Sequence, residues 1–126
     1  MTAKTGKGRI RKGREAENEV VELLHGFGFT HAERRRLSGN RDLGDIAGIP
    51  CVLIDVKDHA TLDLAGAMDG IETKVDEAER EGRVIAIAAA IFKRRGRDIG
   101  EWYAVVSAET FAWMCAQLAK AEVLPS

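Results

Sequence analysis

The feature that most constrains the fold of this chain is an uninterrupted apolar run that ends at Phe92. After Arg83 the run contains only Val, Ile, Ala and Phe, without the polar alternation of a half-exposed strand. A strand that is apolar on both faces is typical of a sheet whose two faces are both covered. Residues 83–92 therefore predict a central buried strand.

The rest of the pattern predicts a mixed β-sheet flanked by helices, built as one α/β unit in the order αβββαβ followed by β and α. Residues 14–27 and 64–81 repeat apolar side chains at helical spacing. Ser107 is placed to N-cap a final helix that would turn Phe111, Cys115 and Leu118 inward. The other predicted strands are residues 30–36, 44–48, 51–57 and 101–106.

The length of 126 residues suits one domain. We expect residues 1–9 to form a flexible basic tail and residues 10–126 to form the domain. No apolar run approaches the ~20 residues that cross a bilayer, so a membrane protein is not expected. Cys51 and Cys115 lack metal-ligand spacing and indicate a reducing, cytoplasmic setting.

Positive charge is segregated although the net charge is only −1. Three basic clusters alternate with acidic stretches, which predicts a basic face for DNA or RNA; any one cluster alone reads equally well as a solvated loop. The candidate contacts are Arg9, Arg11, Lys12 and Arg14, then Arg34, Arg35, Arg36, Ser38 and Arg41, then Lys93, Arg94 and Arg95. Ser38 lies in a Ser-Gly loop that also reads as a simple turn.

Glu17 is the acidic residue that helical geometry singles out. At ~100° per residue it falls inside the apolar arc of the first helix, between Leu24 and Val21. A carboxylate in a buried stripe is costly unless it is paired or binds a cation. Glu17 is therefore a candidate ligand, or else an edge carboxylate or the partner of an arginine.

The predicted hairpin supplies two further acids and an amine. Asp55 and Lys57 are two residues apart on one strand and so share a face. Asp45 on the preceding strand joins them only if the pairing register places it opposite Leu53 or Asp55. The alternative is an ordinary edge hairpin with half-exposed aspartates and a surface lysine.

Glu17, Asp45 and the Asp55-Val56-Lys57 segment together resemble the PD-(D/E)xK nuclease superfamily, and most closely its archaeal-type and phage-encoded Holliday junction resolvases. The opening Lys12-Gly13-Arg14-Glu15-Ala16-Glu17 segment, Gly28-Phe29 and the Ser38-Gly39 loop share the likeness, which covers residues 10–92. Gly44 stands where these enzymes usually have Pro, and Asp55 where they usually have glutamate. Their helical glutamine has no clear counterpart; Glu72 and Lys74 are the nearest candidates.

The resemblance implies a single restriction-endonuclease-like domain and a Mg2+- or Mn2+-dependent endonuclease acting in DNA recombination and repair. Asp45, Asp55 and the Val56 carbonyl would hold the ion, Glu17 would assist, and Lys57 would orient water or neutralise charge on the phosphate. Four-way junctions or other branched DNA would be the substrate of a homodimer, in a bacterial, archaeal or phage-infected cell. Another nuclease of the superfamily and a non-catalytic nucleic-acid-binding protein remain alternatives.

Overall fold

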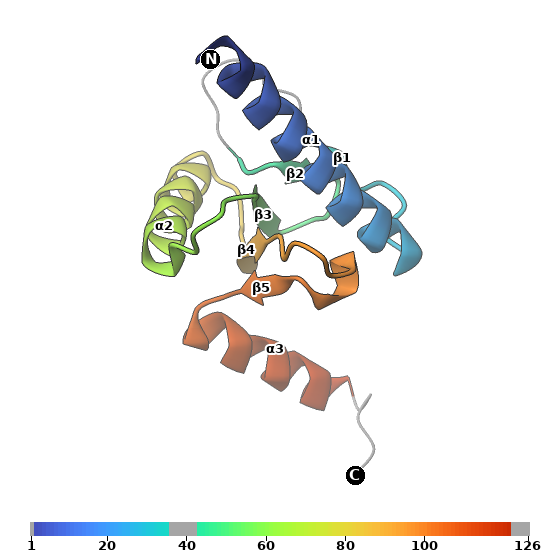
Figure 1. Cartoon of the computed structure of the whole chain (residues 1–126). Coiled ribbons are helices and arrows are strands. Elements are labelled where there is room, and N and C mark those ends of the chain that lie inside the picture. The colour runs from blue at the N-terminus through green and yellow to red at the C-terminus, as the bar shows by residue number, and fades with distance from the viewer. Residues whose placement is uncertain (1, 36–42, 122–126) are drawn as a thin grey trace.

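The computed structural model of the chain describes residues 2–35 and 43–121, with side chains from residue 13 onward. These residues form an α/β fold of three α-helices and a five-stranded mixed sheet, in the predicted α-βββ-α-β-β-α order. Figure 1 shows the sheet in the middle of the molecule, with α1 (Thr2–Gly26) on one side and α2 (Leu64–Arg80) on the other. No helix within the described residues is long and apolar enough to cross a membrane.

Helix α1 (Thr2–Gly26) begins twelve residues before the predicted start at residue 14, so residues 2–9 of the expected tail lie within it. Lys, Arg and Ala in residues 2–13 are good helix formers, but the three glycines and two threonines there are poor ones, so helix propensity alone does not account for the extension. The helix ends where predicted. Gly28 takes φ = +100°, and two hydrogen bonds, from Phe29 N–H to the Leu24 carbonyl (3.0 Å) and from Gly28 N–H to the His25 carbonyl (3.0 Å), form a Schellman motif.

The strands lie in the order β1-β2-β3-β4-β5, and only the β3–β4 pair is parallel. The predicted hairpin is present as β2 (Ile46–Ala47) and β3 (Val52–Lys57), with Ile46 opposite Ile54. Helix α2 (Leu64–Arg80) connects β3 to β4 (Ile87–Phe92). Every expected strand is shorter than predicted. β1 covers Glu33–Arg34, β2 covers two of the expected residues 44–48, β3 starts one residue late, and β4 starts at Ile87 rather than at residue 83. β5 covers Tyr103–Val105, after a short 3-10 helix, η1 (Ile99–Glu101).

The two faces of β3 belong to two separate cores. Ile54 packs with Ala16 and Val20 of α1, whereas Leu53 packs with Ile71 of α2 and Phe92 of β4. β4 is apolar on both faces because both cores contact it, as its sequence predicts. The alternation along β3 therefore turns Asp55 toward the α2 side of the sheet.

Helix α3 (Ala108–Lys120) is N-capped by Ser107, as predicted, but its predicted inward face is wrong. None of its side chains is buried, and the exposed fractions are 50% for Phe111 and 43% for Leu118. Figure 1 shows the reason: α3 lies beyond β5, away from the two cores. An apolar stripe predicts a face that needs cover, and here no other described element supplies that cover.

Candidate active site

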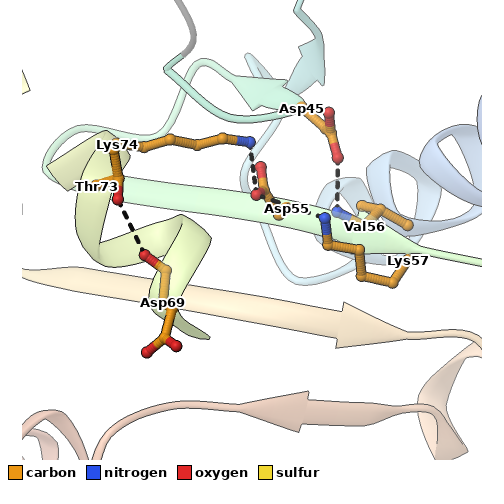
Figure 2. Close-up of polar contacts among 7 residues, drawn as sticks. All are labelled: Asp45, Asp55, Val56, Lys57, Asp69, Thr73 and Lys74. Carbon is orange, nitrogen blue, oxygen red and sulfur yellow. Dashed lines mark hydrogen bonds and ion pairs between the residues drawn. The ribbon is translucent and has the colours of Figure 1, made fainter. Parts of the chain in front are cut away.

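Asp55 is the buried centre of the candidate site. It lies in the middle of β3, paired with Ala90 of β4, and its exposed fraction is 2%. Lys74 Nζ donates to Oδ2 of Asp55 at 2.6 Å, and Lys57 Nζ lies 4.0 Å from the same oxygen (Figure 2). The other oxygen, Oδ1, is buried and has no hydrogen-bond partner among the described residues. A buried acceptor without a partner is costly, and such an oxygen suits a cation.

Asp45 is brought to Asp55 by an irregularity in the hairpin. Asp45 N–H donates to the Ile54 carbonyl at 2.7 Å, while Ile46 is also paired with Ile54. Two residues opposite one is the arrangement of a β-bulge, which re-aims a side chain. The Asp45 carboxylate accepts a hydrogen bond from Val56 N–H at 2.7 Å, as Figure 2 shows. The Asp45 carboxylate is thus held against the Asp55-Val56 segment by this bulge, with the Asp45 backbone bonded to Ile54 rather than placed opposite Leu53 or Asp55.

Proline could not occupy position 44, the residue before Asp45. Its φ is +93°, which the fixed ring of proline cannot adopt. A Cβ at Gly44 would also lie 2.8 Å from the Ile54 carbonyl oxygen. Glycine, in place of the proline usual in the resolvases, therefore fits a position where the backbone is left-handed and runs close to β3.

The Asp45 carboxyl has a pKa raised from 3.8 to about 6. Partial burial, which disfavours the charged form, is the largest cause, and the carboxylates of Asp55 and Glu17 raise the pKa further. The Val56 N–H and the Lys74 ammonium act in the opposite direction. Asp55 and Glu17 are therefore each close enough to Asp45 to act on it electrostatically.

Glu17 lies on α1 and is partly buried, as the helical geometry predicts. Its Oε1 accepts a hydrogen bond from Arg34 Nε at 3.0 Å, which is the arginine pairing that the sequence left open. Within the described residues, no three His, Cys, Asp or Glu side chains are close enough together to hold a metal ion. Asp45 and Asp55 remain the candidate pair, and the roles of Glu17 and the Val56 carbonyl as ligands stay predictions.

The structure places Lys74 at the site, although the sequence motif assigns it no role. It was only a candidate for the helical position where the resolvases have glutamine. Its position three residues after Ile71 and four before Ala78, both buried, was a signal that it faces the sheet.

The basic residues divide between the fold and the surface. Lys93 Nζ lies 3.7 Å from Glu19 and 5.6 Å from the Trp102 ring centroid, and the Arg94 guanidinium lies 4.5 Å from that of Tyr103. Arg35 is partly buried, whereas Arg14 and Arg95 are exposed. Arg36, Ser38 and Arg41, and the side chains of Arg9, Arg11 and Lys12, lie outside the described residues.

A cleft of about 650 Å3 lies beside the hairpin turn, lined by residues that include His31, Arg35, Cys51 and Arg83. Asp45 and Asp55 do not line it, so the carboxylate pair and this cleft are separate features.

Two carboxylates and two ammonium groups around the central strand β3 can bind a hard cation and a phosphate. Searches of family models, curated proteins and solved structures found no match to this chain.

Proposed function

We propose that this protein is a metal-dependent DNA endonuclease of the PD-(D/E)xK type. One observation carries the proposal: Asp55 is 2% exposed, has a buried oxygen that no described residue hydrogen-bonds, and lies beside Asp45 and two lysines. Burying a carboxylate and leaving one of its oxygens without a partner lowers stability. An arrangement that costs stability in this way is typical of functional sites.

Asp45 and Asp55 would hold Mg2+ or Mn2+ through hard oxygen ligands. When bound, the ion would supply Lewis-acid polarisation of the scissile phosphate. Lys57, at 29% exposure the more accessible lysine, would neutralise charge on the phosphate oxygens. Water would attack phosphorus, the bond to the 3′ oxygen would break, and a proton would pass to that oxygen, as the resemblance implies.

We further propose branched DNA, such as a four-way junction, as the substrate. Two matched cuts across a junction need two sites, which a two-fold homodimer supplies. Helix α3 is our candidate for the dimer contact, because Phe111 and Leu118, seven residues apart on one helix face, are 50% and 43% exposed on a helix with no buried side chain.

The test is Mg2+-dependent cleavage of a synthetic immobile junction, compared with linear duplex of the same sequence. We expect Asp55→Asn to abolish cleavage while junction binding remains. Asp69→Asn is the matched control, since this exposed aspartate on α2 points away from the site in Figure 2. Cleavage by Asp55→Asn at the wild-type rate would refute the proposal, and equal cleavage of linear duplex would refute the junction specificity.

The ion pair between Lys74 and Asp55 favours one alternative, a nucleic-acid-binding protein in which these acids only stabilise the fold. That protein would bind DNA equally well with Mg2+ or EDTA, and wild type would not cut. The same assay therefore distinguishes the two functions.

A further inference from the structure

Lys74 is the closer of the two lysines at Asp55. Its ammonium lies 2.6 Å from Oδ2, against 4.0 Å for Lys57, and its side chain is 19% exposed. Figure 2 shows Lys74 reaching from α2 to β3. The contact joins residues 19 positions apart, so it depends on how the helix packs on the sheet.

The position of Lys74 on α2 is unusual for a lysine. Ile71 and Ala78, one turn before and after it, are 1% and 0% exposed, and residues at this spacing share a helix face. An ammonium taken partly out of water on such a face needs a charged partner. The Asp55 carboxylate, at 2% exposure, is also out of water and needs a positively charged partner in the same way. Each group offsets the desolvation of the other.

The charges of the site balance without a metal ion. Asp45 and Asp55 carry two negative charges when ionised, and Lys57 and Lys74 carry two positive charges, while Glu17 is paired with Arg34. A divalent cation on the Asp45–Asp55 pair would add two positive charges. Of the two ammonium groups, that of Lys74 is nearer to Asp55 and would meet the stronger repulsion.

We infer that the Lys74 ammonium serves as the resident counter-ion of the Asp55 carboxylate and competes with the divalent cation for it. The inference rests on the proposed function, since it concerns the same metal site. In the metal-free protein, Lys74 keeps the buried carboxylate paired. When the cation binds, Lys74 moves away from Oδ2, so metal affinity is set partly by the displacement of this lysine.

The test is Mn2+ binding to the DNA-free protein, followed by the electron paramagnetic resonance signal of free Mn2+. Lys74→Met removes the competing charge and keeps the length of the side chain, and we expect it to tighten Mn2+ binding about tenfold, within the usual range for two coupled ligands. Lys74→Arg keeps the charge and should bind Mn2+ as wild type does. Lys120→Met, on the exposed end of α3, controls for loss of a surface charge.

Thermal unfolding gives a second readout. In EDTA, Lys74→Met should melt below wild type because Asp55 loses its partner, and Mn2+ should raise its melting temperature more than that of wild type. If Lys74→Met does not fold in EDTA, Lys74→Gln replaces it. This variant lacks the charge but can still donate a hydrogen bond to Asp55, and its Mn2+ affinity and melting temperature are compared with those of wild type in the same way.

The outcomes separate this inference from the proposed function. If wild type binds Mn2+ and Lys74→Met binds it equally or more weakly, Lys74 does not compete, and only the inference fails. If wild type binds no Mn2+ at all, the metal site itself is wrong, and the proposed function fails as well.

Discussion

The raised pKa of Asp45 predicts that the metal-free protein loses stability as the pH rises from about 4 to about 7. The carboxyl pKa is about 6 in the folded protein against 3.8 ordinarily. Between these values the folded state binds more protons than the unfolded state, so the free energy of unfolding falls with increasing pH. Below the lower value both states are protonated, and the penalty is absent.

The magnitude follows from the difference between the two pKa values. At 1.36 kcal/mol per tenfold change, complete ionisation would cost at most about 3 kcal/mol. Asp45 is only partly buried, so solvent screens part of this cost, and we expect a change of about 2 kcal/mol. The comparison is with Asp45→Asn, which cannot ionise and whose amide oxygen can still accept the hydrogen bond from Val56 N–H.

The assay is denaturant unfolding in EDTA at several pH values, for wild type and Asp45→Asn. The wild-type free energy of unfolding minus that of the variant should fall by about 2 kcal/mol across this window. A difference that stays constant, or that rises with pH, would refute the assignment of Asp45 to a desolvated site near other carboxylates. Because the proton and a divalent cation compete for the same carboxylate, metal binding should weaken below about pH 6.

Two further predictions concern the backbone of the site and the exposed helix. Gly44→Ala should lower the free energy of unfolding by about 1–3 kcal/mol in a denaturant titration, because φ is +93° and the new Cβ would meet the Ile54 carbonyl; Gly70→Ala, with open space in α2, should not destabilise the protein. Replacing Phe111 and Leu118 together by Ser should halve the mass measured by light scattering without lowering stability, whereas Phe27→Ser, exposed on α1, should not change the mass. A wild-type mass equal to one chain would contradict the dimer.

The sequence was sufficient for features that depend on local periodicity. The apolar run predicts a strand covered on both faces, and the alternation along 51–57 places Asp55 and Lys57 on one face; both are confirmed. Ser107 as an N-cap is confirmed because capping is decided within a few residues. The start of α1 is the exception, since helix propagation through a basic segment leaves no marker at its first residue.

Features that depend on packing between distant elements could not be predicted from the sequence. The position of Asp45 relative to Asp55 rests on a bulge at Ile54, which alternation alone does not predict. The contact of Lys74 with Asp55 rests on the rotation of α2 over the sheet. The exposure of α3 rests on where β5 ends, and no pattern within the helix encodes it.

Several basic residues that the sequence offers as DNA contacts already have partners within the fold. Arg34 is hydrogen-bonded to Glu17, Lys93 contacts Glu19 and Trp102, and Arg94 stacks on Tyr103. A cation whose charge is already matched by a carboxylate releases fewer counter-ions on binding DNA than a free one does. Arg95, at 60% exposure and 3.9 Å from Asp58, is more available. Among the described residues, the cations without a close carboxylate or ring contact are therefore fewer than the three clusters of the sequence suggest. Exposed Arg95 follows the end of β4, where Phe92 pairs with Lys57 of β3.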